Sequence, residues 1–310
     1  MHVPKISVGL PVYNGERYLR QAVASILNQD YGDFELIISD NASTDATRDI
    51  CLDFAFRDNR IRYSRNDTNI GASGNYNRVV GLARGEFFKW AAHDDVHLQG
   101  CLRRCIEIFG QASSSTVLVA PTSEIIDENG NRTAAVVECL DARQSHPHER
   151  IAEVLRNVCW APAQFGLFRA EALKKTRLIQ PYFASDFVLL VEVALLGEIR
   201  EFPEVLFQRR VHPDISTNTN RNWLQFQAWF DPSQKSLKRF IHPDMRVGMG
   251  FLSAIARMPM PVRERLLCYK TILTVWLPRK CGQITRNWRN HIALRTRLKK
   301  SVAKVFRQPI

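Results

Sequence analysis

Strand-like and helix-like segments alternate regularly over the first 120 residues of the chain. Apolar runs at 6–10, 34–38, 61–64, 87–91 and 117–120 are typical of strands, and segments with apolar residues at helical spacing lie between them. This alternation predicts an α/β fold, doubly wound, with a mostly parallel sheet. Ligands of such sheets bind beyond the carboxyl ends of the strands. The residues that follow each run are therefore the first candidates for a functional site.

Polar or acidic residues follow three of these predicted strands. The segment 11–16 (PVYNGE) follows the first, 40–45 (DNASTD) the second, and Asp94 and Asp95 the fourth. Two adjacent carboxylates are costly unless a cation neutralises them. Mg²⁺ or Mn²⁺ binds carboxylate oxygens and leaves positions open for phosphate oxygens. Alone, the pair fits the cap of a helix beginning near Val96, but three strand-end sites together favour a metal.

The other two strand-end segments suit a nucleotide, although not a dinucleotide. The segment 40–45 offers oxygens for a base or a ribose, and it also fits an Asx-rich turn before a helix. Neither 11–16 nor the predicted loop at 71–74 (GASG) has the G-x-G-x-x-G pattern of a dinucleotide site. A nicotinamide-dependent enzyme is therefore disfavoured.

Beyond residue 120 the pattern is less regular. We predict a hairpin turn at 127–131, helices at 150–158, 170–175 and 186–196, and a strand at 204–211. From residue 222 onward the pattern is helical with proline breaks. These features predict a catalytic domain over 1–220, with halves at 1–120 and 121–220, and a helical extension over 221–310.

The net charge of +12 is concentrated at the end of this extension. Residues 262–310 hold 13 Lys or Arg and one acid, Glu264, so the rest of the chain is neutral. Bases interleaved with apolar residues and with Trp276 and Trp288 are typical of a segment that binds an anionic membrane surface. A helical subdomain with solvated charges fits equally well. Binding of nucleic acid through this segment is a further alternative, which the neutral body and the acidic strand ends disfavour.

Cysteine usage and hydropathy limit the cellular setting. Seven scattered cysteines, an odd number, suggest no disulfide framework. We see no secretory signal and no apolar stretch of the roughly 20 residues that a spanning helix needs. We therefore expect a cytoplasmic protein, with possible peripheral attachment to the inner face of the cell membrane through residues 262–310.

Four blocks together carry a resemblance to a known family. In order and spacing, 5–14 (KISVGLPVYN), 39–45 (SDNASTD), 69–71 (NIG) and 93–95 (HDD) resemble the family-2 inverting glycosyltransferases of the GT-A fold, over roughly residues 4–215. The resemblance implies transfer of a sugar from a nucleoside diphosphate donor, most commonly UDP, to a saccharide or lipid-linked hydroxyl acceptor with Mn²⁺ or Mg²⁺. Residues 1–120 would form the nucleotide-sugar half, and 121–220 the acceptor half.

The resemblance also implies roles for matching positions. Asp186 would be the general base, since a carboxylate near the acceptor hydroxyl removes its proton during attack; the alternative is a helix cap. Asp95 and His212 would hold the metal, although His212 also fits a loop histidine with no ligand role. The nucleotide and its diphosphate would contact Pro11, Tyr13, Glu16, Asp40, Asn41 and Asp94. The donor and acceptor pocket would include Trp160, Phe165, Gly166 and Arg209, of which the aromatic residues also fit plain core packing.

The chain departs from the family pattern in ways that bear on activity. Its metal motif is His-Asp-Asp instead of Asp-x-Asp, and Ser185 precedes the predicted base. It has no Gln-x-x-Arg-Trp motif, which argues against a processive synthase and favours single transfers in the synthesis of a surface polysaccharide or glycolipid. A Mg²⁺-dependent nucleotidyltransferase also uses paired carboxylates and remains the alternative enzyme.

Overall fold

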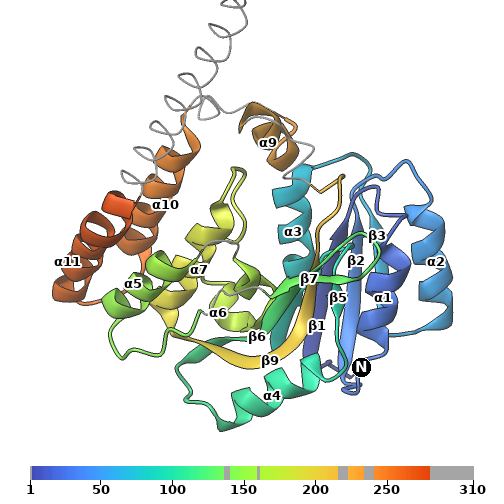
Figure 1. The fold of residues 1–310 in the computed structure, drawn as a ribbon, viewed down its shortest axis with the longest axis horizontal. Coiled ribbons are helices and arrows are strands. Elements are labelled where there is room, and N and C mark those ends of the chain that lie inside the picture. The colour runs from blue at the N-terminus through green and yellow to red at the C-terminus, as the bar shows by residue number, and fades with distance from the viewer. Residues whose placement is uncertain (1, 136–139, 159–160, 216–222, 234–240, 280–310) are drawn as a thin grey trace, which may run out of the picture.

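The computed structural model describes residues 2–135, 140–158, 161–215, 223–233 and 241–279. Nine strands form one sheet in the order β3-β2-β1-β4-β8-β6-β9-β5, with β7 paired to β6 (Figure 1). The predicted α/β fold with a mostly parallel sheet and a helical C-terminal region is confirmed.

The first half of the sheet is parallel and covered on both faces. It consists of β1 (Ile6–Val12), β2 (Phe34–Asp40), β3 (Ile61–Arg65) and β4 (Phe87–Trp90). Alternate residues of a strand face opposite sides, so Leu36 and Ile38 join the core under α1 (Leu19–Leu27) and α2 (Thr47–Arg57). Ile37 joins the opposite core with Val79 of α3 (Gly71–Leu82). Burial on both faces explains why these strands read as unbroken apolar runs.

The second half of the sheet contains short antiparallel strands that the sequence did not predict. β8 (Leu167–Arg169) pairs antiparallel with β4 and with β6 (Thr116–Ile126), and β7 (Arg132–Ala135) completes the predicted hairpin. β9 (Glu198–Arg210) runs parallel to β6 along its length. Near its end β9 also pairs with β5 (Val96–His97), which places it beside the residues that follow β4.

Two local predictions are wrong. No helix begins near Val96: β5 (Val96–His97) pairs with β9, and α4 (Cys101–Gln111) starts after Gly100, whose φ is +89°. The pair Asp94 and Asp95 therefore does not cap a helix. The predicted loop at 71–74 is the first turn of α3, because Gly71 at φ +80° turns the chain directly into the helix.

The remaining helices cover the second half of the sheet and continue beyond it. They are α5 (Pro147–Asn157), the 3₁₀ turn η1 (Pro162–Phe165), α6 (Ala170–Leu173), α7 (Ser185–Leu196), α9 (Trp223–Phe230), α10 (Pro243–Arg257), α11 (Val262–Thr271) and the π-helical turn η3 (Ile272–Trp276). Side chains of α10 and α11, such as Phe251 and Cys268, are buried in the same core as α5 and α7. Within the described residues, no helix combines the length and the hydropathy that crossing a bilayer requires.

Candidate active site

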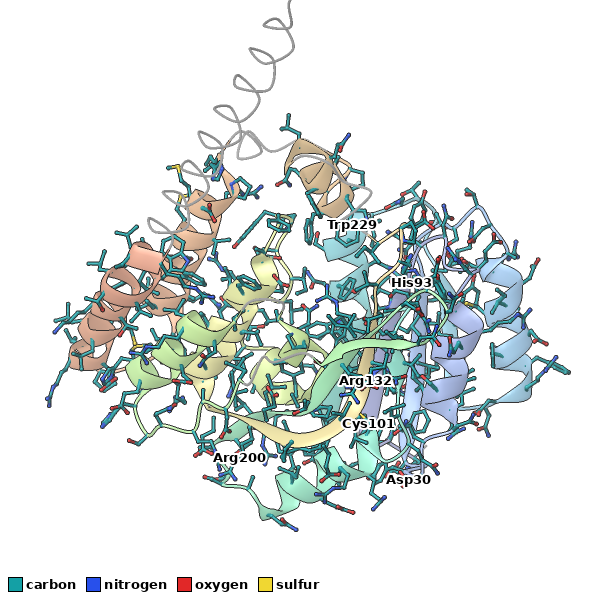
Figure 2. All side chains as sticks on the ribbon, viewed as in Figure 1. Asp30, His93, Cys101, Arg132, Arg200 and Trp229 are labelled. Atoms are coloured by element: carbon teal, nitrogen blue, oxygen red, sulfur yellow. The ribbon has the colours of Figure 1, made fainter. Side chains whose placement is uncertain are left out.

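A cavity of about 730 Å³ opens at the carboxyl ends of β1 and β4. His93 and Trp229 lie toward this end of the sheet, whereas Asp30 and Cys101 lie toward the opposite end (Figure 2). Residues that follow β1, β2 and β4 contribute to its lining, together with residues of α3, η1, α7, α9 and the end of β9. Of the predicted site residues, the lining includes Pro11, Tyr13, Asn41, Asp94, Asp95, Phe165, Asp186, Arg209 and His212.

The end of β9 fixes the position of the acidic pair. Asp95 Oδ1 accepts a hydrogen bond from the backbone N–H of Arg210 at 2.8 Å, and Arg210 Nε donates to the Asp94 carbonyl at 2.8 Å. His212 follows two residues later, with its Nε2 3.1 Å from Asp94 Oδ2. The antiparallel pairing of β5 (Val96–His97) with β9 therefore brings together residues that lie more than 110 positions apart in the sequence.

Burial and mutual repulsion oppose full ionisation of the acidic pair. Asp95 is 4% exposed, and burial together with the neighbouring Asp94 charge raises its pKa to about 8. Burial also opposes ionisation of Asp94, but His93 and His212 outweigh it and hold the Asp94 pKa below its usual value. Asp94 Oδ2 and His212 Nε2 lie 3.1 Å apart beside the cavity, and carboxylate oxygens with an imidazole nitrogen suit a divalent cation such as Mn²⁺. The residues present therefore fit the predicted metal.

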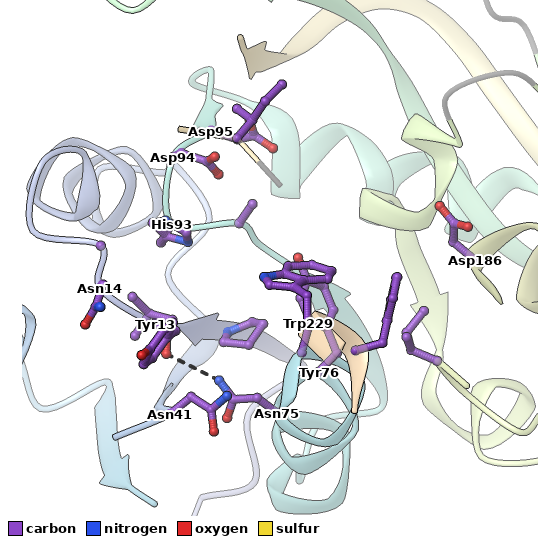
Figure 3. A pocket seen from close by; sticks show the side chains of 18 of the residues that line it. Tyr13, Asn14, Asn41, Asn75, Tyr76, His93, Asp94, Asp95, Asp186 and Trp229 are labelled. Carbon is purple, nitrogen blue, oxygen red and sulfur yellow. Dashed lines mark hydrogen bonds between the residues drawn. The ribbon is translucent and has the colours of Figure 1, made fainter. Parts of the chain in front are cut away.

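Residues that are predicted to contact a nucleotide line the neighbouring part of the cavity. Tyr13 is 42% exposed at the end of β1, beside Asn41 and Asn75 (Figure 3). Asn41 is held by the loop before α3: its Nδ2 donates to Asn69 Oδ1 at 2.9 Å, and its Oδ1 accepts from the Ile70 N–H at 2.9 Å. These contacts fix the strand-end loops as one wall of the cavity.

Three predicted site residues do not line the cavity, which corrects the expectation that they do. Asp40 is fully buried, and its carboxylate accepts hydrogen bonds from the Ser43 N–H, Tyr63 Oη and Arg65 Nη1. Glu16 accepts from the Ala46 N–H at 2.9 Å and joins the loops after β1 and β2. Gly166 packs against β6, since a Cβ there would lie 2.7 Å from Leu118 Cδ1. Trp160 lies outside the described residues.

Asp186 reaches the cavity from the opposite side. In Figure 3 it lies across the cavity from Tyr13 and Asn41, and also from Asp94 and Asp95. Ala184 occupies the capping position of α7 at φ +62°, so Asp186 lies inside the first turn, where its Oδ1 accepts from the Phe187 N–H at 3.0 Å. A helix N-terminus favours the ionised form of a carboxylate.

Aromatic residues that the sequence analysis did not single out form the outer part of the cavity. Trp229 is 38% exposed and Phe183 is 41% exposed, and the Phe183 ring lies 4.8 Å from that of Phe226. α9 is fastened to α3 by Ser73 Oγ, which donates to the Phe230 carbonyl at 2.8 Å. The dense aromatic spacing of 223–230 (WLQFQAWF) is the signal that could have indicated a wall of this kind.

Comparisons with known proteins agree on one family. A family model described as glycosyl transferase family 2 matches residues 7–176. The chain is 27% identical over 267 residues to an uncharacterised glycosyltransferase of Rickettsia prowazekii, covering 83% of this chain and 80% of that one. Over 101 residues it is 39% identical to the GalNAc(5)-diNAcBac-PP-undecaprenol β-1,3-glucosyltransferase of Campylobacter jejuni, covering 32% and 33% of the two chains.

Solved structures share the fold. S. aureus TarS 1–349 in complex with UDP is similar with a TM-score of 0.54 and 18% identity, covering 90% of this chain and 92% of that one. The mannosyltransferase PcManGT from Pyrobaculum calidifontis, in complex with GDP-Man and Mn²⁺, gives a TM-score of 0.53 and 16% identity, covering 93% and 85%. The chain therefore belongs to glycosyl transferase family 2 and is a glycosyltransferase with a fold of the GT-A type.

Proposed function

We propose that this glycosyltransferase is inverting and non-processive, and that it moves a sugar from a nucleoside diphosphate donor to a hydroxyl acceptor. The observation that carries the proposal is the shared cavity, in which Asp186 faces the Asp94/Asp95 pair from another wall. A base and a diphosphate site on separate walls leave room between them for a donor sugar. In-line attack on such a sugar inverts its anomeric carbon.

The proposed roles follow from charge and position. Asp94, Asp95 and His212 would hold Mn²⁺ or Mg²⁺, which when bound neutralises the departing diphosphate. Arg209 would add charge-assisted hydrogen bonds to phosphate oxygens. Asp186 would accept the proton of the acceptor hydroxyl as that oxygen attacks the sugar.

A UDP-sugar is the donor that we propose. The similar TarS structures contain UDP or UDP-GlcNAc, and the PcManGT structure contains GDP-Man with Mn²⁺. In this chain Pro11, Tyr13 and Asn41 would contact the nucleoside, and Phe165 would line the part of the cavity that holds the sugar. Asp40 would act indirectly, because its hydrogen bond with the Ser43 N–H holds the loop that contains Asn41.

A product assay tests the reaction class. Thermal shift first identifies which nucleotide sugars bind in the presence of Mn²⁺. The protein is then incubated with these donors and with saccharide or lipid-linked acceptors. We expect a nucleoside diphosphate as the released product. Pyrophosphate would instead indicate a nucleotidyltransferase. A product sugar that keeps the anomeric configuration of the donor would overturn the inverting mechanism.

The acceptor that we propose is lipid-linked, in a surface polysaccharide or glycolipid pathway, and reached at an anionic membrane surface. The relative from Campylobacter jejuni is named for an undecaprenol-linked acceptor. On α11 and η3, the exposed residues Val262, Leu266, Leu273 and Leu277 recur on one helical face beside the exposed bases Arg263 and Lys270. Apolar and basic groups on one face suit an anionic bilayer; the remaining bases of 280–310 lie outside the described residues.

Liposome flotation tests the membrane proposal. The double variant Leu266→Glu, Leu273→Glu changes two exposed side chains and spares the buried Cys268 and Ile272. It should lose binding to vesicles that contain phosphatidylglycerol and keep the thermal stability of the wild type. Undiminished flotation of the folded variant would contradict membrane binding through this face.

A further inference from the structure

A second cluster of metal-binding side chains lies outside the active-site cavity. His146 precedes α5, His148 lies in its first turn, and Glu264 lies in the first turn of α11. None of the three lines the cavity. Within the described ranges, this is the one group of three or more His, Cys, Asp or Glu residues whose ligand atoms all lie within 4.8 Å of one another.

The geometry of the cluster matches a small coordination sphere. His146 Nδ1 lies 3.2 Å from Glu264 Oε1, and His148 Nδ1 lies 2.8 Å from Glu264 Oε2. Ligands of a tetrahedral Zn²⁺ with bonds of 2.0–2.1 Å lie about 3.3 Å apart. Small side-chain rotations would therefore convert the two imidazole–carboxylate contacts into three bonds to one ion.

We propose that His146, His148 and Glu264 bind a borderline divalent transition-metal ion, of which Zn²⁺ is the best match. Two imidazoles and one carboxylate select Zn²⁺ or Co²⁺ over Mg²⁺, which prefers oxygen ligands and octahedral geometry. The His146 side chain is 58% exposed, which gives the ion an entry path and leaves a fourth position for water.

The consequence of such an ion is a clamp between two parts of the chain. Glu264 is the only acid of residues 262–310, and it contacts α5 of the sheet-covering layer. Cys268 of α11 and Ile151 of α5 are buried in the same core, so α11 already lies along this segment. A metal held by all three residues would stabilise the docking of the C-terminal helices without any part in sugar transfer.

Zinc titration of a variant with a silenced active site tests the proposal. In the Asp94→Asn, Asp95→Asn background the acidic pair no longer competes for the ion. Calorimetry then measures the binding of Zn²⁺ to the His146, His148 and Glu264 cluster. We expect one Zn²⁺ per chain, a rise in melting temperature on binding, and a tetrahedral visible spectrum with Co²⁺. Removing a residue that only hydrogen-bonds to a metal ligand typically weakens metal binding by about 10–100-fold. His146→Ala and Glu264→Gln each remove a ligand itself, so each should weaken zinc binding by at least about 100-fold.

A matched control separates this cluster from an ordinary exposed histidine. His2 also pairs with a carboxylate, Asp33, at 2.7 Å but has no second histidine beside it. His2→Ala should therefore leave zinc affinity unchanged. Because His146 is largely exposed, His146→Ala should fold, and its melting temperature in EDTA checks this. Zinc affinity that is unchanged in both His146→Ala and Glu264→Gln, or lowered equally in His2→Ala, would overturn the proposal.

Discussion

At the scale of single residues, the Asp94/Asp95 pair depends on neighbours that are distant in sequence. Two adjacent acids at a strand end fit either a helix cap or a metal site. The structure removes the first possibility, because the chain continues as β5 and Asp95 accepts a hydrogen bond from the Arg210 backbone. One Asp95 carboxylate oxygen is held in this way and Asp94 lies next to His212, which supports the proposed cation site.

The proposed base makes a sharp prediction at this scale. Asp186→Asn keeps the size and the first-turn position of the side chain but cannot accept the acceptor proton. We expect kcat to fall by about 10²–10⁴-fold, with the nucleotide-dependent thermal shift retained. Asp244→Asn is the matched control, since Asp244 lies in the first turn of α10 outside the cavity. Wild-type turnover of Asp186→Asn would remove Asp186 from the role of base.

Asp95→Asn separates metal binding from folding. The amide keeps an oxygen for the Arg210 N–H and cannot ionise, which removes charge repulsion from a buried pair. We expect the metal-free melting temperature to stay at or above the wild-type value, while the Mn²⁺-dependent shift with UDP and the transfer activity are lost. A Mn²⁺-dependent shift of wild-type size would show that Asp95 is not needed for the cation.

The sequence predicts strand-end residues of the site well and distant ones poorly. Tyr13, Asn41 and Asp94 follow apolar strands, and the rule that ligands bind at carboxyl ends places them together. The aromatic wall with Trp229 depends on α9 docking against α3 through Phe230, which no local pattern encodes. Asp40 was misjudged for a related reason: its partners Tyr63 and Arg65 come from the neighbouring strand.

At the scale of elements, predictability follows length and burial. The four parallel strands are buried apolar runs, and all four are predicted within two residues at each end. β5 and β8 have two and three residues, too few for any periodicity. The first turns of α3 were missed because glycines disfavour helix, and tertiary contacts outweigh that cost.

Gly71 tests how α3 and α9 are joined. It adopts φ +80°, and a Cβ there would lie 2.4 Å from the Phe230 carbonyl oxygen. Gly71→Ala should lower the free energy of unfolding by about 1–3 kcal/mol through backbone strain alone, with more from displacement of α9. Gly81→Ala, in the same helix with nothing within 4 Å of the added Cβ, should instead be neutral or stabilising. Urea unfolding measures both variants, and equal behaviour would contradict the assigned strain.

Glu35 predicts an acid-sensitive link between β1, β2 and β3. Burial opposes its ionisation, but hydrogen bonds from Ser7, Arg62 and Arg84 outweigh burial and hold its pKa below the ordinary 4.5. A depressed folded-state pKa means that its contribution to stability is complete above about pH 4.5 and is lost as the pH falls through the folded-state value.

Glu35→Gln should therefore lower the free energy of unfolding by about 2 kcal/mol at pH 7. The loss is no larger because the guanidinium groups of Arg62 and Arg84 are partly exposed. Below pH 4 the loss should become progressively smaller. Urea unfolding from pH 3 to 7 measures this difference. Glu86→Gln, at an exposed ion pair with Lys5, should show a small difference throughout. A Glu35→Gln deficit that does not shrink in acid would contradict the depressed pKa.

At the scale of the whole molecule, the C-terminal helices bear on the predicted division at residue 220. Phe251 is 1% exposed and belongs to one continuous core with Leu189 and Val193 of α7. Its ring meets that of Trp276 edge-on at 5.5 Å, so η3 is fastened to α10 as well. A core shared across the predicted boundary favours one cooperative unit over an appended domain.

Phe251→Ala distinguishes these two descriptions. Truncating a buried Phe costs about 3–5 kcal/mol. If α10 and the catalytic layers unfold together, this loss should lower the midpoint temperature of a single unfolding transition. Circular dichroism and the thermal shift measured with UDP should then report the same midpoint. If 221–310 is a separate domain, the variant should instead show an early transition that leaves nucleotide binding intact. Leu252→Ala, next in the chain but 45% exposed, should move neither signal, because the deleted side chain contributes little buried area to the shared core.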